Sequence, residues 1–180
     1  MVYMLLGTGF EETEAIAPLD LMRRAGIEVL TVGIGAQTVT GGHGIAVQTD
    51  ITLEQMDLTQ LEMIVIPGGL GGVASIRASA PAMEALRFAY ENDRYVAAIC
   101  AGPTVLADLH ITDGRNTTCY PGCETGMGNA NVDDTVPCVR DGKIITGASA
   151  DCAIPFGLKL VEALKGTNAA KQIAAQIVIR

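Results

Sequence analysis

The chain contains 180 residues, 49% of them hydrophobic, and carries a net charge of −8 with a pI of about 4.6. This hydrophobic content argues against a disordered chain and predicts one domain that covers residues 1–180 and buries a full core. The acidic balance disfavours a nucleic-acid partner, because nucleic-acid binding needs clustered lysine and arginine side chains.

Two further features of the composition indicate the cellular setting. The apolar runs fall well short of the ~20 residues that span a bilayer, and the N-terminal residues lead directly into a strand pattern without the basic segment of a signal peptide. The five cysteines are odd in number and scattered along the chain, which favours free thiols in a reducing compartment. We therefore expect a cytoplasmic protein with no membrane partner.

Strand and helix patterns alternate along most of the chain. Short apolar runs such as residues 63–66 are typical of strands buried on both faces, and alternation with helices predicts an α/β fold with a mostly parallel sheet and right-handed crossovers. Residues 38–47 resemble a hairpin with a glycine-rich tip, and residues 50–61 form a polar connection. The predicted strands are 2–6, 28–34, 63–66, 96–99, a short one ending at 117–118, and a hairpin joining 136–139 to 144–146; the predicted helices are 15–25, 82–92, 104–109, 156–164 and 168–178.

The first predicted helix follows three glutamates and contains a proline. Pro18 would clash with the carbonyl group of Glu14 inside a helix, so the regular helix is expected to begin near Ala17 or to kink there. Glu14 would then lie at the carboxyl edge of the sheet, where ligands bind. The simpler interpretation of Glu11, Glu12 and Glu14 is that they are solvated acids in a first helical turn.

Two glycine-rich turns follow predicted strands. Gly7 and Gly9 suggest a dinucleotide-binding turn, but the third glycine of that motif is replaced by Glu12, and the acidic neighbours would repel a pyrophosphate. Residues 67–72 lack the lysine of a phosphate-binding loop. Their backbone amides could donate hydrogen bonds to an oxyanion, or the segment could be a plain turn.

A cysteine follows the apolar run 96–99 and precedes the small residues and proline of a helix start. Cys100 would thus occupy a strand–turn–helix elbow, where a helix N-terminus favours a thiolate. The alternative is a buried cysteine of the core, a common place for a free thiol.

Four segments of this chain, in this order and spacing, resemble the ThiJ/PfpI family, which includes the parkinsonism-linked DJ proteins. The resemblance implies a flavodoxin-like three-layer sandwich with a nucleophile elbow, and a homodimer. The segments are Glu11–Glu14, Leu21–Gly26, Val65–Gly69 and Ala97–Pro103.

The same resemblance assigns roles to individual residues. It implies that Cys100 is the nucleophile and that Glu14 is a protonated carboxyl that donates a hydrogen bond to the thiolate. Gly69 and Ala101 match the positions whose amides line an anion pocket. Family members are described as cofactor-independent glyoxalase III enzymes, which convert methylglyoxal to lactate, as deglycases, as chaperones and as oxidation sensors.

The sequence departs from the family pattern after the strand at 117–118. Many members place a histidine there, whereas this chain has Cys119, which could act as a resolving thiol. The two histidines are His43, on the glycine-rich tip, and His110, expected at the surface. His43 could complete the pocket of a partner subunit, or it could be an exposed loop residue.

The remaining cysteines suggest no metal centre. Cys119 and Cys123 are four apart without the second pair typical of a zinc site, so we expect neither a metal nor a cofactor. Cys138 and Cys152 are interpreted as core residues.

Three functions follow from these observations. The first is a Cys100-dependent enzyme on reactive carbonyls, of glyoxalase III or deglycase type, with Glu14 as the proton carrier. The second is a stress protein, oxidation-sensing or chaperone-like, that uses the same cysteine. The third is hydrolysis of amides or peptides, which the absent Cys–His pair disfavours.

Overall fold

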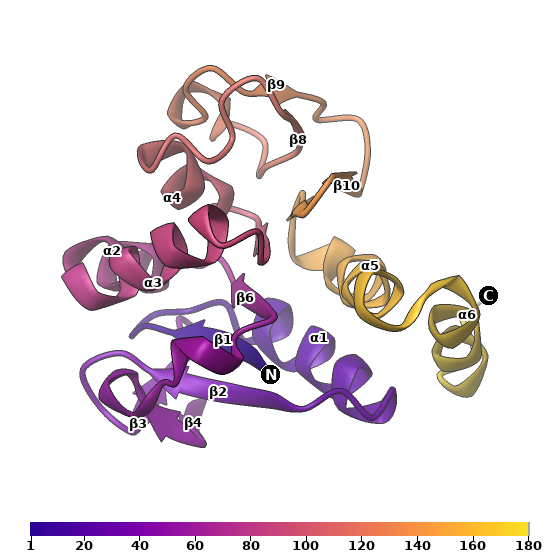
Figure 1. Ribbon diagram of the computed structural model, residues 1–180, viewed down its shortest axis with the longest axis horizontal. Coiled ribbons are helices and arrows are strands. Elements are labelled where there is room, and N and C mark those ends of the chain that lie inside the picture. The colour runs from indigo at the N-terminus through magenta and orange to yellow at the C-terminus, as the bar shows by residue number, and fades with distance from the viewer. Residues whose placement is uncertain (180) are drawn as a thin grey trace.

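The computed structural model describes residues 1–179, which fold around a seven-stranded sheet (Figure 1). Neighbouring strands are parallel except for the pair β10–β11. This confirms the α/β class with a mostly parallel sheet. The strand order is β10 (Cys138–Asp141), β11 (Ile144–Gly147), β7 (Tyr95–Ile99), β6 (Met63–Ile66), β1 (Val2–Leu6), β2 (Val29–Gly33) and β5 (Ile51–Thr52).

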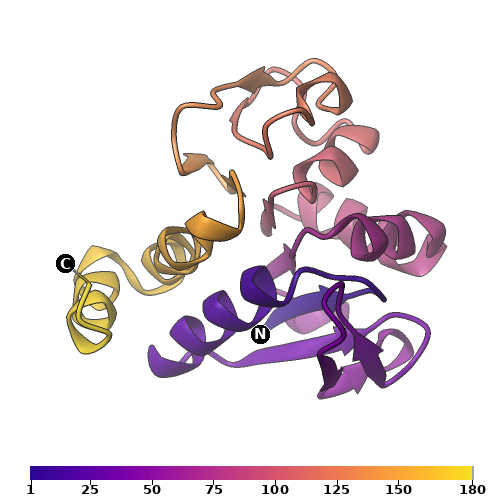
Figure 2. The ribbon, with the colours of Figure 1, turned by 180° about the vertical axis from the view of Figure 1, so that it is seen from behind.

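Helices cover both faces of the sheet, as Figures 1 and 2 show from opposite sides. Along β1, Val2, Met4 and Leu6 face one buried cluster while Tyr3 and Leu5 face the other, as the two-residue period of a strand requires. The structure thus has the three layers of the predicted sandwich. The first cluster packs under α1 (Glu12–Arg24), α5 (Ala153–Lys165) and α6 (Thr167–Gln176), and the second under α2 (Leu70–Ala78), α3 (Ala80–Glu91) and α4 (Pro103–Asp108).

Helix α1 begins earlier than the sequence predicted. It starts at Glu12, and Pro18 lies inside it. Pro18 packs against α5 at Gly157, where an added Cβ atom would lie 2.9 Å from the Cα of Pro18. Helix α1 thus continues through a proline that local rules place at a helix start or a kink, and it packs closely against α5 at this point. As a result Glu14 lies in the first turn of α1.

Two further elements differ from the prediction. The glycine-rich turn at 67–72 passes into helix α2 after only three residues, so glycines that resemble a loop form its first turn. The polar connection at 50–61 contributes β5, the edge strand of the sheet.

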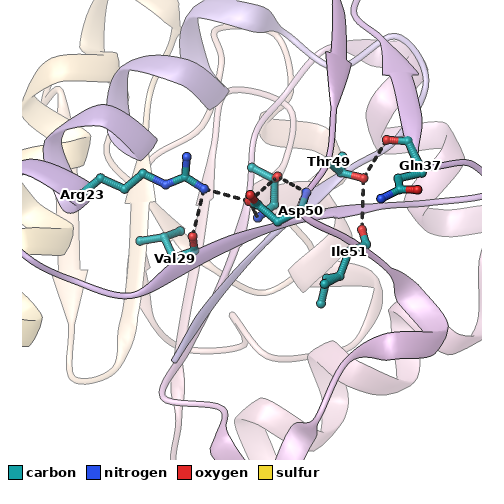
Figure 3. Close-up of polar contacts among 7 residues, drawn as sticks. Arg23, Val29, Gln37, Thr49, Asp50 and Ile51 are labelled. Atoms are coloured by element: carbon teal, nitrogen blue, oxygen red, sulfur yellow. Dashed lines mark hydrogen bonds and ion pairs between the residues drawn. The ribbon is translucent and has the colours of Figure 1, made fainter.

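The hairpin of β3 (Thr38–Thr40) and β4 (Ala46–Gln48) lies outside the main sheet and is fixed at its base (Figure 3). The carboxylate of Asp50 accepts hydrogen bonds from the N–H and hydroxyl groups of Thr31 at 2.8 and 2.7 Å, and from Arg23 of α1 at 2.7 Å. The hydroxyl of Thr49 donates to the carbonyl of Gln37 at 2.8 Å. These contacts hold the hairpin next to α1, so that its tip has a fixed position.

Within residues 1–179 none of the helices combines the length and the apolar character that crossing a bilayer requires.

Candidate active site

Cys100 occupies the predicted elbow between β7 and α4. Its φ of 65° is uncommon for a residue other than glycine and marks a backbone that the surrounding structure must hold in place. Two hydrogen bonds do so: its N–H donates to the carbonyl of Gly147 at 2.9 Å, and its carbonyl accepts the N–H of Tyr120 at 2.9 Å. The fold thus directs the thiol away from the core, so that Cys100 is only partly buried.

Glu14 projects from the first turn of α1 and is 1% exposed. Its Oε2 atom accepts the N–H of Gly68 at 2.7 Å. Its Oε1 atom is buried, and no nitrogen or oxygen donor of residues 1–179 lies within hydrogen-bonding distance of it. A buried carboxylate with an unpartnered oxygen is unfavourable, which favours a carboxyl group that keeps its proton.

Burial and the close contact between Glu14 and Cys100 determine how the pair ionises. Burial raises the pKa of Glu14 to about 7, although hydrogen bonds from Cys100 and Gly68 lower it in part. Burial, the charge of Glu14 and its hydrogen bond raise the pKa of the Cys100 thiol to about 12. The two groups therefore titrate as a unit that loses its first proton near pH 7, and around neutrality a thiolate exists only while Glu14 retains the proton.

The backbone around the thiol supplies hydrogen-bond donors. The backbone N–H groups of Ala101 and Gly69 both lower the pKa of the Cys100 thiol, because they favour its charged form. Gly69 has a φ of 85°, and an added Cβ atom there would collide with the backbone of Gly9. The close approach of two loops therefore requires glycine at this position and directs its amide toward the sulfur.

Four of the residues predicted from sequence, Cys100, Glu14, Gly69 and Ala101, meet at one pocket. Its volume is about 540 Å³, and His43 of the same chain also lines it. A small dicarbonyl compound is far smaller than this volume, so the pocket has room for a substrate together with water. The other lining residues are Glu11, Leu70, Tyr120, Cys123 and Ala150.

Cys119 does not line this pocket. It is fully buried, and burial raises the pKa of its thiol to about 11. The next residue, Tyr120, faces the pocket, because the bond from its N–H to the carbonyl of Cys100 sets the register of this segment. Cys123 is the second thiol of the pocket. Sequence reasoning missed both residues; the side-chain alternation of an extended segment was the signal that could have found Tyr120.

Glu12 and His43 form a contact that the sequence did not predict. Glu12 is 6% exposed rather than solvated, and its Oε2 atom lies 2.9 Å from Nδ1 of His43. Burial raises the pKa of Glu12, but the hydrogen bonds from His43 and from its own backbone and that of Ile45 outweigh burial and lower the pKa to about 2. Ligand atoms of Glu11, Glu12 and His43 lie within 4.8 Å of one another, so among residues 1–179 this cluster has the spacing of a group that could hold a metal ion.

The remaining predicted residues lie away from the pocket. His110 is exposed, as expected, and pairs with Asp113 at 3.1 Å. Cys152 is buried, as a core residue should be, whereas Cys138 is only half-buried on the edge strand β10. All five cysteines are free thiols.

Comparison with known proteins identifies the family of this chain. The chain is 34% identical to protein dj-1beta of Drosophila melanogaster over 179 residues, which cover 98% of this chain and 95% of that one. It is 33% identical to a deglycase of Pyrococcus abyssi over 132 residues, 73% of this chain and 79% of the relative. The crystal structure of Drosophila DJ-1beta superposes with a TM-score of 0.94 at 31% identity, covering 99% and 97% of the two chains. The model of the DJ-1/PfpI family matches residues 1–163, and the chain belongs to this family.

Proposed function

We propose that this chain is a cysteine-dependent, cofactor-independent enzyme that acts on reactive carbonyls, either as a glyoxalase III-like enzyme or as a deglycase. The observation that carries the proposal is the buried Glu14 carboxyl in contact with the Cys100 thiol in a pocket lined by backbone amides. A relative that covers most of this chain is named a deglycase, which supports the same class of substrate.

In the proposed reaction the Cys100 thiolate adds to the aldehyde carbon of a small α-oxoaldehyde and forms a carbon–sulfur bond. The carbonyl electron pair moves to oxygen, and the N–H groups of Gly69 and Ala101 stabilise the resulting oxyanion. The oxyanion then takes the proton of Glu14, which leaves a hydroxyl group on the thiol-bearing carbon and Glu14 as the carboxylate base. Glu14 then carries the proton that moves from the aldehyde carbon to the neighbouring carbon. This isomerisation yields a thioester of a 2-hydroxy acid, which water hydrolyses to the free acid and the thiol.

The test is lactate formation from methylglyoxal, measured alongside amine release from a methylglyoxal-treated peptide. Glu14→Gln and Cys100→Ser are each expected to abolish both reactions while circular dichroism shows an intact fold. Cys138→Ser is the matched control, since its thiol lies on β10 outside the pocket, and it should retain wild-type rates. A wild-type protein that forms no lactate and releases no amine would remove the proposal.

A second candidate function uses the same thiol as an oxidation sensor. Cys100 is only partly buried, and the backbone amides of Gly69 and Ala101, which line the same pocket, could donate hydrogen bonds to a sulfinate. A protonated Glu14 could donate a third. After mild peroxide treatment, peptide mass spectrometry should find two added oxygen atoms on Cys100 and none on the fully buried Cys119. Oxidation spread evenly over the cysteines would exclude a sensor role.

We also propose that the protein is a cytoplasmic homodimer, as its family resemblance implies. Five cysteines without a disulfide support the compartment. Light scattering should give twice the 18.7 kDa mass of one chain; a monomer at micromolar concentration would contradict the dimer.

A further inference from the structure

The pocket of Cys100 contains an acid–base side chain that the reaction above does not use. His43 lines the pocket from the tip of the β3–β4 hairpin. Its Nδ1 atom lies 2.9 Å from Oε2 of Glu12, and its backbone N–H donates to Oε1 of Glu12 at 2.8 Å. One carboxylate therefore holds both the main chain and the ring of this histidine, which fixes the ring although most of it is exposed.

The carboxylate of Glu12 is itself fixed in place. Its side chain is 6% exposed, and Oε1 also accepts the N–H of Ile45 at 3.4 Å. The side chain of Glu12 occupies the space beside Gly41 in which any larger residue would place its Cβ atom. A solvated acid of a first helical turn needs none of these contacts, so Glu12 fixes the hairpin tip and, with it, the position of His43.

The hairpin tip is connected to the catalytic loops by backbone hydrogen bonds. The N–H of Gly9 donates to the carbonyl of Thr40 at 2.8 Å, and the N–H of Gly42 donates to the carbonyl of Phe10 at 2.8 Å. The N–H of Glu11 donates to the carbonyl of Gly68 at 3.0 Å. The segments that carry His43, Glu14 and the amide of Gly69 therefore form one bonded frame around the pocket.

We propose that Glu12 and His43 form a carboxylate–imidazole pair that acts as the second proton donor and acceptor of the Cys100 pocket. This role rests on the proposed function. Because Glu12 occupies Nδ1, the Nε2 atom of His43 is the ring nitrogen available to a substrate. His43 thus brings an imidazole to the Cys100 pocket from the hairpin tip.

The isomerisation shows why a second proton carrier is useful. When Glu14 removes the hydrogen of the thiol-bearing carbon, the electron pair forms a carbon–carbon double bond, and the ketone oxygen becomes an alkoxide that takes a proton from Nε2 of His43. Glu14 then returns its proton to the second carbon. The hydroxyl of the thiol-bearing carbon loses its proton to Nε2 as the thioester carbonyl forms. Every proton is returned, and neither oxidant nor reductant is consumed.

The titratable groups that contact His43 or line the pocket with it are acidic. They are Glu12, Glu11, whose Oε2 atom lies 3.5 Å from Nδ1, and the Glu14–Cys100 pair across the pocket. The hydrogen bond from Glu12 and the charges of Glu11 and Glu12 raise the pKa of His43. The imidazole therefore remains protonated to a higher pH than an ordinary histidine, as a proton donor at neutral pH should.

The test compares His43→Gln and Glu12→Gln with His110→Gln, since His110 is exposed and lies outside the pocket. His43→Gln should lower kcat for lactate formation about 100-fold, the usual contribution of a general acid–base group. Its rate of Cys100 alkylation by iodoacetamide should stay unchanged, because alkylation needs no second proton donor. His110→Gln should match wild type.

The pH dependence provides a measurement that a purely structural role would not affect. The basic limb of the wild-type kcat/KM profile should follow the His43 titration seen by NMR, with the two histidine signals assigned from the two histidine variants. In Glu12→Gln the basic limb of the kcat/KM profile and the His43 titration should both move to lower pH. Wild-type activity should survive dialysis against EDTA; activity lost on dialysis and restored by zinc would assign the cluster to a metal and overturn the proposal.

The outcomes separate the two proposals. An active wild type whose His43→Gln variant retains its full kcat and its pH profile would overturn the role of His43 and leave the proposed function standing. A wild-type protein that alkylates at Cys100 but forms no lactate and releases no amine would remove the proposed function, and the role of His43 with it.

Discussion

The carboxyl of Glu14 and the thiol of Cys100 meet over the Cα atom of Gly68. An added Cβ atom there would lie 2.5 Å from Oε2 of Glu14, 2.7 Å from Cβ of Cys100 and 3.1 Å from its sulfur. The N–H of the same glycine donates to Glu14. One residue without a side chain thus lets an acid from α1 and a thiol from the end of β7 share a proton.

Replacing Gly68 with alanine should separate this pair. The new methyl group has no room, so either Glu14 or Cys100 must move, and kcat for lactate formation should fall at least about tenfold, as small misplacements of reacting groups do. The free energy of unfolding should fall by about 1–3 kcal/mol, the usual cost of overpacking. Urea titration and turnover assays measure the two effects.

The matched comparison is Gly42→Ala on the hairpin. Its Cβ atom would meet nothing closer than 3.6 Å, so the free energy of unfolding should change by less than about 1 kcal/mol. Equal destabilisation of both variants would show that crowding at Gly68 is not the cause of the lowered free energy of unfolding.

Glu14→Gln should change how the reactivity of Cys100 depends on pH. In wild type the pair loses its first proton near pH 7, and part of the resulting charge lies on sulfur, so the alkylation rate should rise around that pH. The glutamine side chain of the variant cannot exchange a proton with the thiol, so the rise in alkylation rate near pH 7 should vanish. One rise at higher pH should remain, because burial still raises the pKa of the Cys100 thiol. Rates of Cys100 alkylation measured by mass spectrometry from pH 5 to 10 decide between the two shapes.

Stability should depend on pH through Glu14. Its pKa is about 7 in the folded protein against an ordinary value of 4.5, so the folded state binds the proton more tightly. Its contribution is therefore complete below pH 4.5 and is lost as the pH rises to about 7, by on the order of 3 kcal/mol. Glu14→Gln should lack this loss.

The comparison between wild type and Glu14→Gln isolates this effect from other titrating groups. Glu12 has a lowered pKa of about 2, so its contribution is complete above pH 4.5 and is lost only in more acidic solution. His43 has a raised pKa, so its contribution to stability is lost as the pH rises above the ordinary pKa of a histidine. This loss is the same in both proteins. Parallel urea-derived stability curves for the two proteins between pH 4.5 and 8 would contradict the assignment.

Gly157→Ala tests the contact that positions α1. An added Cβ atom would lie 2.8 Å from Cδ1 of Leu21 and 2.9 Å from the Cα of Pro18. Helix propensity alone would make alanine more stable by about 1 kcal/mol, whereas overpacking should cost about 1–3 kcal/mol. The sign of the change in unfolding free energy decides which effect dominates, and a stabilised variant would show that the helices can separate at little cost.

The sequence alone was enough to predict the central sheet and the elbow. Runs such as residues 63–66 and 96–99 are apolar on both faces because helices cover both sides of the sheet. The motif around Cys100 is local, so its turn could be predicted as well. The start of α1 could not, because Pro18 indicates a later start or a kink, whereas the helix begins at Glu12 and packs against Gly157 of α5, far along the chain.

For the pocket, the sequence determined which residue types are available: a cysteine at an elbow, an acid near the first helix, and glycines after a strand. Only the tertiary structure decided that Glu12 is buried against His43, that Tyr120 rather than Cys119 faces the thiol, and that the hairpin tip lies in the same chain's pocket. The physical reason is that a parallel sheet gathers the loops at its carboxyl edge from segments distant in sequence. A local sequence pattern does not show which side chains of these segments come into contact.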